Sequence, residues 1–330
     1  MAILSRSRFA ALFTTLGVAV TMGSAQAQEL KLAHFVPPAH VVTSAVVEPF
    51  KRAVEADSNG ELTVRVYPGG ELGAGPMEQY VRALQGVADI TWGLAGYTSS
   101  QFRRSMIVEL PGAIPEGMTG YDMIWNAFDT SLRGEFPGTK PLALWVSEPN
   151  VFIMKDREVR SPEDLRGLKI RVSGAVAGEF VRTMGGTPVQ MAAGEMYNAL
   201  QTGLIDGIIT GASAITDFKL DEVANSYTIG APLGNILFYL VMNQRKYDSL
   251  SAEHRAIIDR HSGRVLSQSG EETWNALADR TLEMVRADNR NTVIDLSAAE
   301  VVVFQSVADD FLTSQTADAA ARAVLNDMRN

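Results

Sequence analysis

The residue types that could carry catalysis are few in this sequence, and their spacing is poor for it. The 330 residues include four histidines and no cysteine, which removes thiolate metal sites and cysteine nucleophiles. His254 and His261 lie seven residues apart on one face of a predicted helix, as solvated surface residues often do. His34 and His40 flank a diproline and could hold a metal, but no H-E-x-x-H motif or third ligand accompanies them.

The serines, glycines and carboxylates give no stronger case for an enzyme. The G-x-S-x-G elbow of α/β-hydrolases does not occur in the sequence. A glycine-rich turn at residues 68–76 has neither the G-x-G-x-x-G nor the P-loop spacing, so phosphate binding is disfavoured. The acidic residues that could pair only by accident of folding are Asp89, Glu109, Glu148 and Glu195. We therefore expect a protein without catalytic residues, metal or cofactor.

One arginine, Arg171, stands where ligands commonly bind. Apolar and polar residues alternate over residues 168–173, which predicts a strand with Arg171 and Ser173 on the same face. Gly174 ends this strand, and a helical pattern follows over residues 175–184. Arg171 therefore lies near the carboxyl end of a strand that leads into a crossover helix, where open α/β sheets bind ligands. Spacing alone leaves two interpretations open: a ligand clamp, or a strand arginine paired with a surface carboxylate.

Strands and helices alternate along the rest of the chain, which indicates an α/β fold. A capped helical turn follows Ser161, the apolar run 236–243 is typical of a strand buried on both faces, and the helix 251–288 is unusually long with a weak point at Gly270. Further strands are expected at 30–35, 61–67, 86–94, 141–147 and 227–230, and further helices at 40–57, 77–85, 120–133, 217–224, 297–313 and 318–328.

The first 27 residues read as a secretory signal peptide. Arg6 and Arg8 precede an apolar core at residues 10–20, and Ala25-Gln26-Ala27 forms an A-x-A cleavage site, with cleavage expected at about Ala27/Gln28. The mature chain keeps 27 basic against 38 acidic side chains, a net charge of −11, so nucleic acid is a poor partner. Without a cysteine for a lipid anchor, we expect a freely soluble periplasmic protein.

Two motifs resemble those of a known family. The segments LRGLKIRV (165–172) and EMYNALQTGLIDG (195–207) are similar to paired motifs of the substrate-binding proteins of TRAP transporters (tripartite, ATP-independent; the DctP family), and the likeness covers nearly the whole mature chain. The resemblance implies that Arg171 clamps the carboxylate of the substrate. It also implies an α/β, two-domain periplasmic-binding-protein fold, type II-like, with a ligand cleft between the domains and a long interdomain helix.

The resemblance further implies a domain division and a mechanism. Domain I would take residues 28–148 and about 236–275, and domain II residues 149–235 and about 276–330, in line with a length beyond what one core usually covers. Substrate would close the hinge, and the closed form would dock on TRAP membrane subunits for uptake driven by ion gradients rather than ATP. Ligand sensing for a membrane kinase stays an alternative. The sequence leaves the oligomeric state open, with a monomer favoured.

The chain departs from the commonest pattern of this family at two positions. Asn150 stands where a second arginine is common, and Thr210 where an asparagine follows D-G-x-E. A site with Arg171 as its one certain cation would bury a second carboxylate at high cost. We therefore expect a small monocarboxylate with an apolar or aromatic body, with a C4-dicarboxylate or sugar acid as the alternative. The candidate ligand-binding residues are Arg171, Asn150, Thr210, Trp92, Trp145, Phe152, Ser173, Phe35, Glu71 and Phe238, with Ile209 as further apolar surface.

Overall fold

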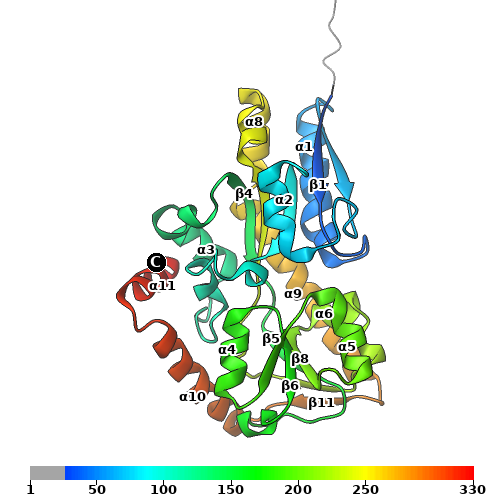
Figure 1. Cartoon of the computed structure of the whole chain (residues 1–330), viewed down its shortest axis with the longest axis vertical. Helices are drawn as coiled ribbons and strands as arrows, with labels where there is room; N and C mark the ends of the chain where they lie inside the picture. The colour runs from blue at the N-terminus through cyan, green and yellow to red at the C-terminus, as the bar shows by residue number, and fades with distance from the viewer. Residues whose placement is uncertain (1–26) are drawn as a thin grey trace, which may run out of the picture.

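The computed structural model describes residues 27–330, so the predicted signal peptide lies outside the described residues apart from its last residue. Two β-sheets lie one above the other in Figure 1, each with helices packed around it. The first has the order β2-β1-β3-β10-β4, in which β1 pairs in parallel with β2 and β3, and β10 runs antiparallel to β3 and β4. Its strands are β1 (Gln28–Ala33), β2 (Leu62–Tyr67), β3 (Ile90–Leu94), β4 (Thr139–Val146) and β10 (Leu237–Asn243). Strand β10 is buried along its whole length, as its apolar run predicts.

The second sheet has the order β11-β9-β5-β8-β6-β7. Strand β6 pairs in parallel with β7 and β8, whereas β5 runs antiparallel to β8 and β9. Its strands are β5 (Asn150–Met154), β6 (Lys169–Val172), β7 (Thr187–Gln190), β8 (Gly207–Gly211), β9 (Ser226–Ile229) and β11 (Thr292–Asp295). The α/β class expected from the sequence is thereby confirmed, and the strands form two separate sheets.

The chain passes between the sheets along two segments that pair with each other. Strand β4 ends at Val146 and β5 begins at Asn150, while the return segment precedes β10. The Ser147 amide donates to the Ile236 carbonyl at 2.8 Å, and the Asn150 amide to the Gly234 carbonyl at 2.9 Å. A hinge between the sheets would bend here. The predicted boundaries of the two domains stay a prediction.

Most helices are short and cover the sheets, as Figure 1 shows. In the described part of the chain, none is both long and apolar enough to span a membrane. Beside the first sheet lie a π-helical turn (Thr43–Val47), α1 (Glu48–Asp57), α2 (Gln79–Gln85), α3 (Gly120–Ala127), α7 (Gln244–Asp248) and α8 (Ala252–Arg260), and beside the second lie α4 (Ala175–Thr183), α5 (Met196–Thr202) and α6 (Ser213–Asp217).

The long helix is α9 (Arg264–Ala287), which contacts β4 of the first sheet and α6 and β11 beside and within the second. The interruption of the helical pattern lies at Gly263, with φ of 73°, rather than at Gly270. Gly270 has a packing role instead. A Cβ atom there would lie 3.0 Å from the ring of Trp145, so only glycine lets the helix approach the indole this closely.

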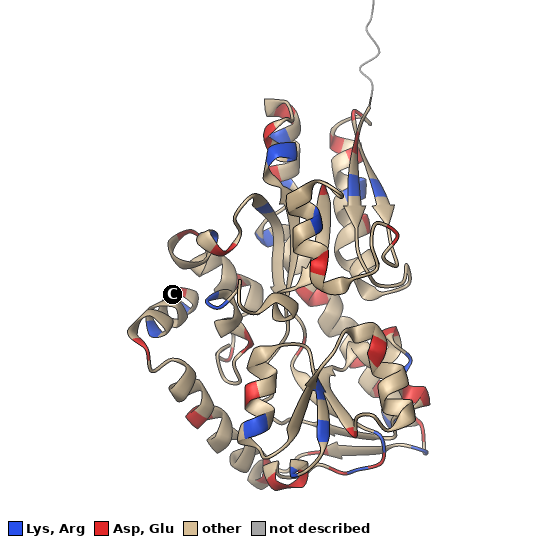
Figure 2. Ribbon diagram, in the orientation of Figure 1, with Lys and Arg blue, Asp and Glu red and all other residues tan. Residues whose placement is uncertain are grey.

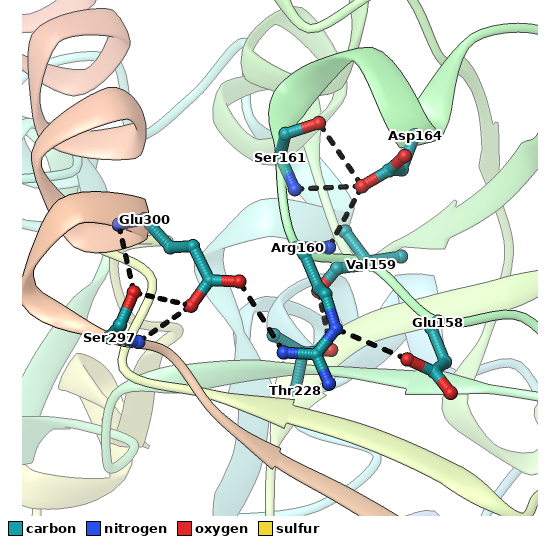
Figure 3. A network of polar contacts seen from close by, with 8 residues as sticks. All are labelled: Glu158, Val159, Arg160, Ser161, Asp164, Thr228, Ser297 and Glu300. Atoms are coloured by element: carbon teal, nitrogen blue, oxygen red, sulfur yellow. Dashed lines mark hydrogen bonds and ion pairs between the residues drawn. The ribbon is translucent and has the colours of Figure 1, made fainter.

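A polar network attaches the C-terminal helices to the second sheet (Figure 3). Ser297 and Glu300 form a capping box at the start of α10 (Ala298–Gln315), and Arg160 contacts Glu300 at 3.4 Å. The predicted turn after Ser161 is present as a 3₁₀ helix (Pro162–Leu165). The Ser161 amide, at the start of this helix, donates a hydrogen bond to the Asp164 carboxylate at 2.8 Å. Helix α11 (Ala319–Arg329) then packs on α3 beside the first sheet (Figure 1), so the end of the chain touches elements of both halves.

The helix expected over residues 217–224 is wrong in its bounds. Helix α6 ends at Asp217, and a separate 3₁₀ turn covers Leu220–Glu222. Lys219, with φ of 55°, adopts the left-handed conformation that ends a helix, which a helical pattern in the sequence does not reveal. Charged residues lie mainly along the outer elements, with both signs interspersed (Figure 2).

Candidate ligand-binding site

A cavity lies between the two sheets, near the carboxyl ends of β3, β6 and β8. Its walls come from both halves of the molecule and are mainly apolar, with a few polar groups, as is typical of sites for small organic molecules. The lining residues are Phe35, Val36, His40, Trp92, Leu94, Ser147, Arg171, Ala193, Met196, Thr210, Gly211, Ser213, Ala214, Asp217, Phe218, Ile236, Phe238 and Trp274.

Arg171 is a buried cation without a bonded anion. Its side chain is 1% exposed, and its Nε and Nη2 atoms donate to the Met191 carbonyl at 3.2 and 3.0 Å. Within residues 27–330, no carboxylate lies within 4.0 Å of the guanidinium to form an ion pair. Burial lowers the pKa of Arg171, while the Tyr97 hydroxyl and, more weakly, Glu195 favour its charged form. Because burying an unpaired charge is costly, the arrangement favours an anion in the cavity.

A close contact between the halves sets the position of this arginine. A Cβ atom on Gly174, which follows β6, would lie 2.7 Å from the Cα atom of Gly96, so glycine is needed on this side. Gly96 lies in the 3₁₀ turn Ala95–Thr98, which also carries Tyr97, and the Tyr97 hydroxyl accepts a hydrogen bond from the Ala193 amide at 2.8 Å. Tyr97 of the first half therefore lies beside Arg171 of the second.

Aromatic rings form the opposite part of the wall. Phe35 stacks on Trp92 with centroids 5.0 Å apart and planes at 16°, and Trp92 packs on Phe238 at 5.6 Å. Phe238 in turn packs on Trp274 of α9 at 5.1 Å. These residues lie on separate segments, namely the end of β1, β3, β10 and α9, and together they provide flat apolar surface next to a single cation.

His40 and Asp217 form a second polar contact across the cavity wall. The Val42 amide donates to His40 Nδ1 at 3.1 Å, so the ring proton is on Nε2, which lies 3.4 Å from Asp217 Oδ2. The Val41 amide donates to Asp217 Oδ1 at 3.2 Å. Burial lowers the pKa of His40 to about 3 and raises the pKa of Asp217 to about 7. The pair is thus a neutral imidazole donating to a buried carboxyl group.

Five of the residues predicted from the sequence line the cavity: Arg171, Thr210, Trp92, Phe35 and Phe238. The other five lie elsewhere. Trp145 packs behind Phe238 at 5.5 Å, and the Asn150 side-chain amide donates to the Leu233 carbonyl between the crossing segments. Phe152 packs on Phe304 in the core, the Ser173 carbonyl adjoins Gly96, and Glu71 is exposed on the turn after β2.

Strand periodicity accounts for two of these differences. Val151 pairs with Thr210, and Phe152 pairs with Ile209. Since successive side chains of a strand face opposite sides, the face that carries Thr210 excludes Ile209, Phe152 and Asn150. The sequence reasoning placed both faces of these strands on the ligand side.

Sequence reasoning also missed Asp217, Trp274 and Tyr97, and it considered His40 only as a metal ligand. Within the described residues, no group of three His, Cys, Asp or Glu side chains could hold a metal ion. The position of His40, in the segment that leads from β1 (Gln28–Ala33) to the next helix, was the available signal for a cavity residue. Nothing in the pattern of α9 separates Trp274 from a core tryptophan.

Comparison with known proteins agrees with this architecture. Residues 32–317 match the bacterial extracellular solute-binding protein family 7, DctP. A TRAP solute-binding protein from Rhodoferax ferrireducens, solved with copurified benzoate, is 28% identical with a TM-score of 0.85, covering 92% of this chain and 96% of that chain. A marine metagenome TRAP protein solved with 3-hydroxybenzoate is 26% identical with a TM-score of 0.85, covering 92% and 97%.

Among curated relatives, the ectoine-binding periplasmic protein TeaA of Halomonas elongata is 28% identical over 279 residues, covering 81% of this chain and 79% of TeaA. The family match spans far more than half of the chain, and the two-sheet fold is that of periplasmic binding proteins. This chain belongs to the DctP family of periplasmic TRAP transporter solute-binding proteins, which bind solutes and are not enzymes.

Proposed function

We propose that this protein captures a small monocarboxylate with an aromatic or other apolar body and delivers it to TRAP membrane subunits. The observation that carries the proposal is Arg171, a buried cation without a bonded anion in a cavity walled by stacked aromatic rings. A planar guanidinium can hold a carboxylate with two parallel hydrogen bonds, and such a pair gains strength where water is excluded.

The charges of the cavity favour one carboxylate over two. Arg171 is the single lysine or arginine among the lining residues of the described chain. His40 supplies no second positive charge at neutral pH, because burial holds its pKa near 3. Asp217 supplies no positive charge either, and its ionised form would repel a second carboxylate. The remaining lining offers apolar surface, in agreement with benzoate and 3-hydroxybenzoate in two of the similar proteins.

Binding by hinge closure is part of the proposal. The hydrogen bonds that join the halves at the cavity include one from the Ala193 amide to Tyr97 and one from the Val41 amide to Asp217. We expect the halves to separate about the paired crossing segments when the cavity is empty and to close over a ligand. The closed surface would then be the form that docks on the membrane subunits.

Export to the periplasm would remove the signal peptide at about Ala27/Gln28. Strand β1 begins at Gln28, so this cleavage would leave the first sheet intact. Mass spectrometry of the exported protein tests the site, since an N-terminus inside β1 would contradict it. We expect the mature protein to be a monomer, which light scattering on the same sample tests.

Calorimetry on the mature chain tests the ligand class. We expect benzoate and related aromatic monocarboxylates to bind more tightly than succinate, malate or galacturonate. A thermal-shift screen of the same acids is a rapid first step, because a ligand at a hundred times its Kd stabilises a protein by about 2.7 kcal/mol. Tighter binding of the dicarboxylates than of every monocarboxylate would refute the proposal.

A further inference from the structure

We infer that the His40–Asp217 pair recognises a hydrogen-bond donor on the ligand, so that the preferred ligand is a monocarboxylate that also carries a hydroxyl or amino group. This inference rests on the proposed function, because it concerns the same cavity. It assigns Asp217, which lies in the cavity wall beside His40, as a residue that sets specificity for the ligand.

Asp217 has acceptor capacity that the protein leaves unused. The side chains of His40 and Asp217 are 5% and 6% exposed, and both residues line the cavity. A carboxylate offers about four lone-pair sites. The described residues fill two of them, through the Val41 amide at 3.2 Å and His40 Nε2 at 3.4 Å. Both distances are long for hydrogen bonds, so the carboxyl group can accept a stronger one from a ligand.

No cation in the described chain forms an ion pair with Asp217, because His40 is neutral. Burial raises the pKa of Asp217 to about 7, and nearby Glu148 contributes further in the same direction. Glu148 accepts from the Ser213 amide at 2.7 Å through Oε1, while its buried Oε2 atom has no partner in the described residues. Asp217, beside Glu148, thus offers carboxyl oxygens that accept a hydrogen bond, and its ionised form accepts the strongest one from an O–H or N–H donor of a ligand.

The cavity therefore holds one cation and one carboxyl group that do not pair with each other, since no contact within 4.0 Å joins Arg171 to Asp217. A ligand with a carboxylate and a separate donor satisfies both. A ligand such as benzoate satisfies only Arg171 and leaves the acceptor sites of Asp217 facing apolar atoms. A second carboxylate on the ligand can only accept hydrogen bonds, so it cannot donate to the oxygens of Asp217 as a hydroxyl or amino group can.

Calorimetry with matched benzoates tests the inference. The hydroxyl group of 3- or 4-hydroxybenzoate donates, whereas fluorine at the same position is similar in size and cannot. At about pH 8, above the pKa of about 7 that burial gives Asp217, we expect the better hydroxybenzoate to bind the wild-type protein about 10- to 100-fold more tightly than its fluoro counterpart, which is the range for a hydrogen bond to a charged group. The matching aminobenzoates distinguish an amino from a hydroxyl donor.

The variant Asp217→Asn should reduce this ratio to about one while keeping an oxygen that can accept from the Val41 amide. Asp310→Asn, which removes an exposed carboxylate of α10, is the matched control and should leave the ratio unchanged. If the wild-type protein binds the hydroxy, amino and fluoro ligands equally tightly, the inference is overturned. This comparison does not depend on whether the Asp217→Asn variant folds. If no benzoate or other monocarboxylate binds while succinate, malate or galacturonate does, the proposed function is overturned instead.

Discussion

Replacing Arg171 with alanine should abolish most of the affinity for the natural ligand and leave the protein folded. The ligand carboxylate would enter a site that excludes water and find no cation. Truncating one partner of a buried ion pair costs about 3 to 5 kcal/mol, which corresponds to a loss of affinity of roughly a few hundredfold to a few thousandfold. Calorimetry on Arg171→Ala with the tightest acid of the screen measures this directly.

Two further variants separate charge from geometry. Arg171→Lys keeps the positive charge but loses the fork that grips both carboxylate oxygens, so its affinity should lie between those of wild type and alanine. Arg182→Ala is the matched control, because Arg182 lies on α4 with a 60% exposed side chain and, among residues 27–330, forms an ion pair with Glu179 alone. Unchanged affinity in Arg171→Ala would refute the assignment of the clamp. Failure of that variant to fold in the absence of ligand would show that the arginine is structural.

Three other predictions test closure, packing and pH dependence. Saturating ligand should reduce the radius of gyration in X-ray scattering and change the fluorescence of Trp92 and Trp274, both in the cavity wall; identical scattering curves would contradict hinge closure. Gly270→Val should destabilise the fold by about 1–3 kcal/mol, because its side chain would meet the buried ring of Trp145, whereas the exposed Ala276→Val on the same helix reports only the helix propensity of valine. Burial raises the pKa of Glu109 from 4.5 to about 8, so the folded state holds this proton more tightly and stability should fall as pH rises from about 5 to 8. Glu109→Gln should remove roughly 3 kcal/mol of that decline in urea titrations, and an unchanged decline would show that the carboxyl group is not the cause.

The sequence was sufficient for the α/β class, the long helix and the position of Arg171, because each rests on a local period, whereas the two-domain fold was implied by the chain length and the family resemblance. Alternation over residues 168–173 places Arg171 on the face opposite Ile170, and the apolar run 236–243 marks the interior strand β10. These features depend only on neighbours in the chain. The expectation that Arg171 binds a ligand carboxylate came instead from the resemblance of the motifs to a known family, because no local pattern in the sequence identifies the partner of this arginine.

The cavity wall could not be predicted in the same way, because it depends on which faces of distant strands meet. Period-two alternation says that Thr210 and Ile209 face opposite sides but not which side holds the ligand. Asp217 could not be predicted as a cavity residue for a different reason. The helix ends near it because Lys219 adopts a left-handed conformation, and only folding brings Asp217 next to His40, which lies 177 positions earlier in the chain. Long-range contacts of this kind leave no periodic signal.

The free-energy cost of burying the Arg171 charge explains why closure of the two halves would require a ligand. The contacts that join the halves beside the cavity include two hydrogen bonds, from the Ala193 amide to Tyr97 and from the Val41 amide to Asp217, each worth about 0.5–1.5 kcal/mol. Against them stands the cost of burying Arg171 without an anion, which is several kcal/mol per ion. An open state lets water solvate the guanidinium and avoids this cost. A carboxylate bonded to Arg171 removes the penalty, so the same ligand that fills the cavity reverses the balance between the open and closed forms.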